Sequence, residues 1–225
     1  LRGQRSAAVT QFSSFLYSFG GGWFDEEGNS TVSEPEAIQA YEYYGNLLRN
    51  YGPPGTLNMS WPQAIAVFAQ GQAAFYLDAD ILYTNVTNPE TSLVVDQVGF
   101  APFPEGPAGR RPYSVTSWAI GMNSESENKE AAWEFIRWAT SPQIVATMQS
   151  EFGQSGARAS VWASPEGLGG FPEDLANAIV VNGETGVGFD RPRVIRVGEA
   201  RDIVGQPIVT AIEGGDVAAA AAEAD

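Results

Sequence analysis

Apolar side chains recur every three or four positions in several stretches of this chain. Such spacing places them on one face of a helix and predicts amphipathic helices. The stretches are residues 7–19, 37–48, 65–68, 131–139, 144–148, 172–181 and 200–212. The last stretch contains Pro207, which predicts a bend or an interruption there because proline lacks a backbone N–H.

Polar residues and glycines mark where these predicted helices begin and end. A side chain that can cap a first turn stands at Ser33, Ser60, Ser141 and Asp216. The first two precede a Glu or a Gln by three positions, which is the spacing of a capping box. Glycines that can adopt a left-handed conformation predict helix ends after residue 19, at Gly71 and at Gly153.

A different pattern occupies residues 73–77, which are short, apolar and aromatic. This composition predicts a buried strand. Residues 98–101 are expected to form a second strand of the same sheet, and residues 114–122 a further strand. Because strands alternate with helices, the predicted fold class is α/β.

Two acids, Asp78 and Asp80, follow the first predicted strand. In open α/β sheets, ligands bind beyond the carboxyl ends of the strands. Carboxylates at that place either cap the next helix or contact a ligand. The residues alone leave both interpretations open.

Composition excludes several classes of function. The 225 residues carry a net charge of -15, and such a field repels phosphate backbones, so nucleic acid is not expected as a partner. The chain has no His and no Cys, which excludes Ser-His-Asp and Cys-His catalysis, thiolate metal sites and disulfides. The acids of residues 25–29 miss the spacing of an EF-hand, so neither a metal nor a cofactor is predicted.

Eight motifs, spread along the chain in order, resemble those of a known family. They are LRG, FGGGWFDEEG, SEPEA, YGPPGTLNMSW, FAQGQAAFYLDAD, VGFAPFPEGP, SWAIGMNSESENKEAAWEFIRWATS and GARASVW. The family comprises the extracellular solute-binding proteins of ATP-driven sugar importers, in particular the branch for sugars and sugar alcohols. The resemblance implies a two-lobed, periplasmic-binding-protein-like type II fold, of which this chain would be a fragment without most of the amino-terminal lobe.

The resemblance also implies a division of the chain. Residues 1–117 would form the main part of the carboxyl-terminal lobe, residues 118–155 would cross to the amino-terminal lobe, and residues 156–225 would return. The apolar face of residues 131–138 would then lack its natural cover, which predicts an exposed face and either aggregation or a dimer contact. An export signal or lipid anchor would lie outside this chain, in a periplasmic or extracellular protein.

By the same resemblance, five residues are expected to bind the ligand. Their types suit a sugar, which offers hydroxyl groups around an apolar face and needs aromatic rings and charged groups. They are Trp23, Asp78, Asp80, Trp118 and Arg158. Each has an alternative role: core packing for Trp23, a helix cap for Asp78 and Asp80, a buried hinge for Trp118 and the surface for Arg158. The Arg158 guanidinium is also a candidate to pair with Asp78.

Two functions of different classes follow. The first is a binding protein without enzymatic activity, which closes around a sugar or polyol and presents it to the membrane subunits of an ABC permease. The second is a carbohydrate-active hydrolase that uses Asp78 and Asp80, or one of them with Glu105, as an acid and base pair. Turnover of a sugar by the purified protein would distinguish the second function from the first.

Overall fold

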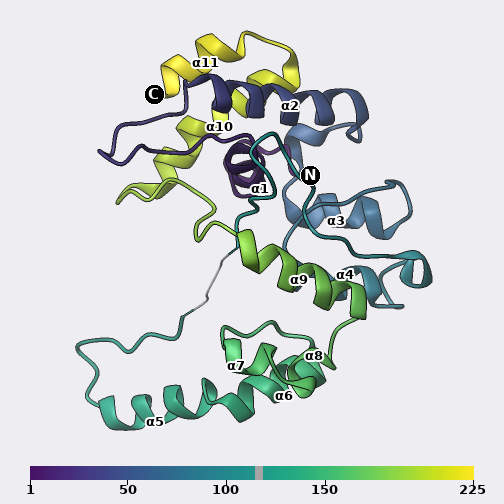
Figure 1. The fold of residues 1–225 in the computed structure, drawn as a ribbon, viewed down its shortest axis with the longest axis vertical. Helices are drawn as coiled ribbons and strands as arrows, with labels where there is room; N and C mark the ends of the chain where they lie inside the picture. Colours follow the sequence, from purple (N-terminus) through teal and green to yellow (C-terminus); the bar gives the residue numbers. More distant parts are fainter. Residues whose placement is uncertain (115–118) are drawn as a thin grey trace. The chain divides into compact units, whose positions relative to one another are not determined.

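The computed structural model describes residues 1–114 and 119–225, and its regular elements are helices (Figure 1). The α-helices are α1 (Arg5–Ser18), α2 (Pro35–Tyr51), α3 (Trp61–Ala69), α4 (Thr84–Thr87), α5 (Lys129–Ala139), α6 (Pro142–Phe152), α7 (Ala159–Trp162), α8 (Pro165–Leu168), α9 (Glu173–Thr185), α10 (Val197–Glu213) and α11 (Val217–Ala224). Short 3-10 helices are η1 (Thr56–Asn58), η2 (Asp80–Leu82) and η3 (Val95–Gln97). All the predicted helical stretches are therefore helical.

The chain divides into two compact units. Unit 1 comprises Leu1–Val98, Pro102–Thr116 and Val180–Asp225. Unit 2 comprises Gly99–Ala101 and Ser117–Ile179. Helix α9 begins in unit 2 and ends in unit 1, while α5, α6, α7 and α8 belong to unit 2.

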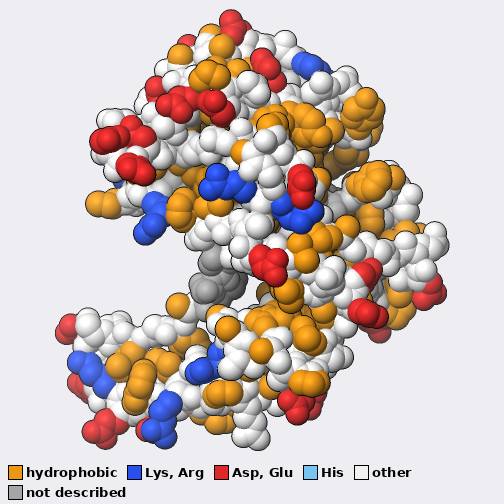
Figure 2. Space-filling view, in the orientation of Figure 1, with side chains coloured by type: hydrophobic (Ala, Val, Ile, Leu, Met, Phe, Trp, Pro, Cys, Tyr) orange, Lys and Arg blue, Asp and Glu red, His pale blue; other side chains and the backbone are white. Residues whose placement is uncertain are grey.

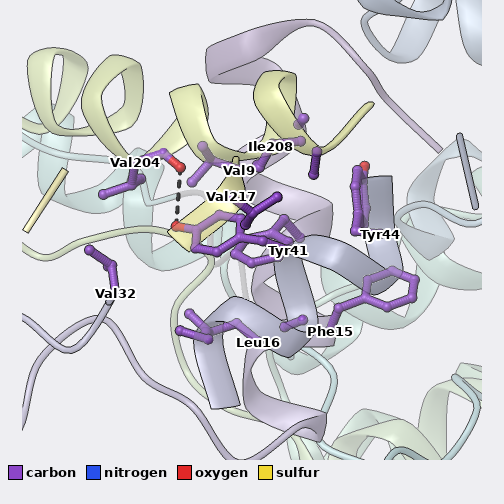
Figure 3. Close-up of a cluster of buried hydrophobic side chains, with 14 of the residues drawn as sticks. Val9, Phe15, Leu16, Val32, Tyr41, Tyr44, Val204, Ile208 and Val217 are labelled. Atoms are coloured by element: carbon purple, nitrogen blue, oxygen red, sulfur yellow. Dashed lines mark hydrogen bonds between the residues drawn. The ribbon is translucent and has the colours of Figure 1, made fainter. Parts of the chain in front are cut away.

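Helices α1, α2 and α10 build the core of unit 1, and their apolar faces meet around stacked aromatic rings (Figure 3). The rings of Phe12 and Tyr41 stack with centroids 4.2 Å apart, and Tyr44 meets Phe12 edge-on. The Tyr41 hydroxyl donates a hydrogen bond of 3.2 Å to the Val204 carbonyl, so the buried ring keeps a polar partner. These contacts join α1, α2 and α10 through one cluster.

A glycine permits the close approach of α2 to α10. A Cβ atom added to Gly45 would lie 2.3 Å from the Cβ of Ala211 and 2.5 Å from its carbonyl carbon. No real side chain tolerates such a distance, so any larger residue at position 45 forces the two helices apart.

Most helix ends lie where the sequence predicts them. Ser60 and Gln63 form the expected capping box, and the side chains of Ser141 and Asp216 accept hydrogen bonds from the first turns of α6 and α11. Gly71 and Gly153 follow helix ends with φ of +73° and +60°. Helix α10 continues through Pro207 without an interruption.

The predicted capping box at Ser33 is wrong. Helix α2 begins at Pro35 with Glu34 as its N-cap, and no side chain caps its first turn. The Ser33 hydroxyl instead donates a 2.7 Å hydrogen bond to Asp225. A partner distant in sequence has replaced the local one.

The predicted strands at residues 73–77 and 98–101 are also wrong, because neither segment pairs with a neighbour in a ladder. Within the described ranges only isolated bridges occur, between Phe24 and Ser30, Gly106 and Gly109, and Tyr113 and Val187. The backbone groups of these extended segments find side chains instead: Gln11 donates to the Leu77 carbonyl, and the Phe100 N–H donates to Asp174 at 2.8 Å. The burial expected for 73–77 fails too, since Phe75 is 92% exposed. Of the third predicted strand, residues 115–118 lie outside the described residues, and 119–122 are irregular.

Helix α5 carries the exposed apolar face that the sequence predicts. Trp133, Phe135 and Trp138 are 54%, 55% and 58% exposed, and none of the α5 residues is buried. Hydrophobic side chains are accordingly visible on the surface over α5 (Figure 2). The part of the chain that the structure describes thus leaves much of the apolar side of this amphipathic helix uncovered.

Candidate functional site

Among the ion pairs of the described residues of unit 1, the pair of Arg2 and Asp78 has the least exposed side chains. The guanidinium grips the carboxylate with two parallel hydrogen bonds, from Nε to Oδ2 at 2.9 Å and from Nη2 to Oδ1. The Asp78 side chain is 0% exposed and the Arg2 side chain 11% exposed. Paired hydrogen bonds of this kind are strong and fix the orientation of both groups.

Two more donors complete the surroundings of Asp78. The Tyr76 hydroxyl donates to Oδ2 at 2.7 Å, and the Ala79 N–H donates to Oδ1 at 2.8 Å. Burial raises the pKa of Tyr76, and the neighbouring Asp78 charge raises it further, so Tyr76 stays protonated as a donor. Burial lowers the pKa of Arg2, but the hydrogen bond and charge of Asp78 outweigh it and leave that pKa raised.

The backbone of Arg2 is held as firmly as its side chain. Its N–H donates to Gln11 Oε1 at 2.6 Å, and its carbonyl accepts from the Tyr44 hydroxyl at 2.6 Å. Gln11 is fully buried in α1, and its amide also donates to the Leu77 carbonyl. The two helices α1 and α2 thereby anchor both Arg2 and the extended segment that carries Asp78.

A second ion pair belongs to the same unit. Arg191 donates from Nε to Oδ1 of Asp190 at 2.6 Å and from Nη2 to Oδ2. Thr10 donates to Asp190 Oδ2 at 2.9 Å. Burial would raise the pKa of Asp190, but the hydrogen bond and charge of Arg191, with the bond from Thr10, hold it below its ordinary value.

The charges of both pairs influence the Tyr113 hydroxyl. Burial raises its pKa, the charges of Asp78 and Asp190 raise it further, and Arg2 acts in the opposite direction. The charge of Asp80, the first residue of η2, also raises the pKa of Tyr113. Unit 1 therefore gathers two guanidinium–carboxylate pairs and two partly buried phenols. Such a set can orient hydroxyl-bearing ligands by hydrogen bonds.

Three predicted site residues, Trp23, Asp78 and Asp80, belong to unit 1. Trp23 is buried in the core, where its ring meets Phe12 edge-on at 6.0 Å. Its indole N–H has no hydrogen bond of ordinary geometry with the described residues. Burial raises the pKa of the nearby Tyr17 hydroxyl, and the Trp23 side chain acts in the opposite direction. Asp80 is the first residue of η2 but no side chain caps that helix.

Arg158 belongs to unit 2 and is exposed. Its Nε donates to the Thr140 carbonyl, which ties the start of α7 to the end of α5. The guanidinium partner of Asp78 is Arg2, and a pairing of Asp78 with Arg158 stays a prediction. Trp118 lies outside the described residues.

Sequence reasoning missed Arg2 and Gln11 altogether. The pairing of Arg2 with Asp78 spans 76 positions, and no local pattern announces a contact at that separation. One signal in the sequence was Gln11 itself. It is the only amide or charged side chain among residues 7–19, and a buried amide demands polar partners.

Other kinds of site find little support in the described part of the chain. It holds no cluster of three His, Cys, Asp or Glu side chains that could bind a metal. A surface depression of about 490 Å³ is lined by Glu173, Asp174 and Asn177, and one of about 380 Å³ by residues 126–131. Both are open hollows of unit 2 without aromatic walls. Among the helices of the described ranges, none combines the length and the apolar character needed to cross a membrane.

Comparison with known proteins identifies the family. Over residues 4–146 the sequence matches the bacterial extracellular solute-binding proteins. The match covers more than half of the 225 residues, and the chain belongs to this family.

Individual relatives support the assignment. The chain is 35% identical over 124 residues to a mannitol-binding protein of Pseudomonas aeruginosa, which is 55% of this chain and 28% of that protein. Among solved structures, it resembles an ABC transporter solute-binding protein of Agrobacterium radiobacter in complex with ribitol (TM-score 0.79, 29% identity, 99% of this chain and 56% of that chain). It also resembles such a protein of Agrobacterium vitis with bound D-mannitol (TM-score 0.80, 26% identity, 99% and 58%).

These likenesses confirm the periplasmic-binding-protein-like fold class, even though the described residues do not pair into strands. The chain spans a little over half the length of these solved relatives and 28% of the mannitol-binding protein.

Proposed function

We propose that this chain is part of the substrate-binding component of an ABC importer and that the whole protein binds a sugar or sugar alcohol. The family match over residues 4–146 is the observation that carries the proposal. One relative is named a mannitol-binding protein, and two solved relatives hold ribitol or D-mannitol, which supports a polyol as the solute. The whole protein would be periplasmic or extracellular, exported by a signal peptide or held by a lipid anchor.

The polar part of the site would centre on the Arg2–Asp78 cluster. A polyol carries a hydroxyl on every carbon, so it needs several fixed hydrogen-bonding groups. The cluster gathers a guanidinium held by a carboxylate, and two phenols, in one unit. Asp80 would add a second acid, and Arg158 a group from unit 2. Trp23 and Trp118 would be the stacking rings, although burial of Trp23 in the core favours packing as its main role.

The proposed mechanism is hinge closure, a transition for which periplasmic binding proteins are the standard example. Residues 1–117 would form the main part of one lobe, residues 118–155 would cross to the other, and residues 156–225 would return. The described residues just before this boundary, 102–114, belong to unit 1 and those from 119 on belong to unit 2, which supports it, whereas unit 2 continues to Ile179. The closed form would be presented to the permease.

Catalysis is not part of the proposal, because the family consists of solute-binding proteins. The geometry of Asp78 gives a second reason. All of its acceptor positions already face donors, and a general base needs a free one for a proton or a water. Self-association of the 225-residue chain through the exposed face of α5 is expected from the apolar area there.

Isothermal titration calorimetry on the full-length protein tests the proposal. D-mannitol, ribitol and erythritol form the panel, with glycine as a control solute of another class. Saturable binding of at least one polyol, with the solute recovered unchanged, is the expected result. Binding of none of them, or conversion of a bound polyol into a product, would contradict the proposal.

A further inference from the structure

We propose that Arg2 is the group of this cluster that contacts the solute, and that Asp78 is a positioning residue that acts only through Arg2. The inference rests on the proposed function and deepens it. The sequence predicts that Asp78 itself binds the solute hydroxyls. In the present proposal Asp78 instead holds Arg2 in position, and Arg2 binds the solute hydroxyls.

The first argument is that Asp78 has no acceptor to spare. Arg2, Tyr76 and the Ala79 N–H supply four donors, two for each oxygen. A carboxylate offers about four lone-pair directions, so this one is saturated. Its side chain is also 0% exposed. A solute hydroxyl could reach either oxygen only by displacing a charged or buried donor, which would leave that donor unpaired.

The second argument is that Arg2 keeps donors free. Its Nε and Nη2 point at Asp78, while Nη1 donates to none of the described residues. The Arg2 side chain is 11% exposed, whereas the Asp78 side chain is 0% exposed. A guanidinium carries five N–H donors in one plane, so fixing two of them on Asp78 orients the others toward whatever lies on the open side.

The third argument is that the residue is held in advance from both ends. Gln11 and Tyr44 bind the backbone N–H and carbonyl of Arg2, and Asp78 binds the far end of its side chain. A long side chain normally loses rotamer freedom when it binds, and a side chain that is already fixed avoids most of that cost. Such support is what a ligand contact requires and what an ordinary surface arginine lacks.

The chemistry of the free edge defines what it would recognise. Guanidinium N–H groups donate and never accept, so they select oxygen atoms with free lone pairs, such as those of neighbouring hydroxyls of a polyol. A hydroxyl removed from the solute at that place would leave a buried donor unpaired, which is a large source of discrimination in binding sites.

A double-mutant cycle in D-mannitol affinity tests the inference on the full-length protein. Arg2→Gln and Asp78→Asn are each expected to weaken binding about tenfold or more, because each removes one charged contact or its support. The double variant should bind within about twofold of Arg2→Gln alone, since Asp78 has nothing left to position. A double variant weakened about a hundredfold, the additive result, would show that Asp78 contacts the solute itself.

Matched variants separate binding from folding. Arg196→Gln makes the same change in an exposed pair of unit 1, Arg196 with Glu199, and should leave the affinity unchanged. Circular dichroism identifies the variants that fold. If Arg2→Gln does not fold, Arg2→Lys takes its place in the double-mutant cycle. Lysine keeps the positive charge without the planar pair of N–H donors, and the same pattern of affinities is expected.

A second measurement responds to ligand contact but not to a purely structural role. The native protein should bind at least one singly deoxygenated mannitol about tenfold more weakly than D-mannitol, and Arg2→Gln should bind the two equally. If Arg2→Gln weakens the binding of D-mannitol and of every deoxygenated analogue by the same factor, the inference is overturned and the proposed function stays intact. If the native protein binds no polyol, the proposed function fails and the inference fails with it.

Discussion

Helices α2 and α5 begin from similar patterns and end in opposite environments. Both place aromatic and aliphatic residues along one face. In α2 that face is closed by α1 and α10, and Tyr41 and Tyr44 are completely buried. In α5 the rings of Trp133, Phe135 and Trp138 stay more than half exposed.

The difference shows that an amphipathic pattern predicts a helix and the side that needs cover, but not whether the cover is present in the same chain. Burial of an aromatic side chain stabilises the fold only when another apolar surface meets it. Equivalent residues of the two helices should therefore respond very differently to the same substitution.

Truncation of aromatic rings should give the largest contrast. Tyr41→Ala in α2 removes a ring stacked on Phe12 and the hydroxyl that donates to the Val204 carbonyl. We expect a loss of about 3–5 kcal/mol in the free energy of unfolding. Phe135→Ala in α5 should change it by about 0.5 kcal/mol or less, because the ring is exposed.

Urea unfolding of the 225-residue chain, followed by circular dichroism, measures both changes. Tyr41→Phe is the matched control, since it keeps the ring and should cost only about 0.5–1.5 kcal/mol for the hydrogen bond. Comparable losses for Tyr41→Ala and Phe135→Ala would remove the contrast between the helices.

Glycine substitutions sharpen the same comparison at a smaller scale. Gly45→Ala forces a methyl group into the backbone of α10 and should destabilise unit 1 by about 1–3 kcal/mol. Gly183 lies within α9 with nothing within 4 Å of an added Cβ, and Gly183→Ala should stabilise the helix by about 0.5–1 kcal/mol. The two melting temperatures should move in opposite directions. An unchanged or higher melting temperature for Gly45→Ala would contradict the close packing of α2 on α10.

Local chemistry made the helices predictable. The capping box of Ser60 and Gln63 and the left-handed glycines at 71 and 153 act within a few positions of the chain, so the sequence contains the whole of each interaction. The strand expected at 73–77 failed because a ladder requires a second strand, and a composition of Ala, Phe, Tyr and Leu specifies none.

The candidate site could be predicted only in part, for the same reason. Asp78 stands out after an apolar segment, but its saturation by Arg2 and Tyr76 depends on contacts that no spacing rule contains. Ser33 gives the opposite lesson: it has the spacing of a local cap, yet its hydroxyl binds Asp225 at the other end of the chain.

Acid titration should give the smallest effect and concerns the buried pair at Asp190. Its pKa is lower in the folded state than the ordinary value of 3.8, so the carboxylate contributes stability above that value and loses it as the pH falls through the folded pKa. Asp190→Asn should therefore show a shallower loss of stability below about pH 5 than the native chain. Urea midpoints at pH 7, 5, 4 and 3 measure the slopes. Identical slopes would mean that the carboxylate is not stabilised by folding.

The most direct test is a crystal structure of the full-length protein with D-mannitol bound. We expect a solute oxygen about 2.7–3.2 Å from Nη1 of Arg2, with the Asp78 carboxylate still held by Nε and Nη2 of the same guanidinium. Solute hydroxyls bonded directly to Asp78, with Arg2 displaced, would contradict the assignment of the two roles. A solute bound away from both residues would remove this cluster from the binding site.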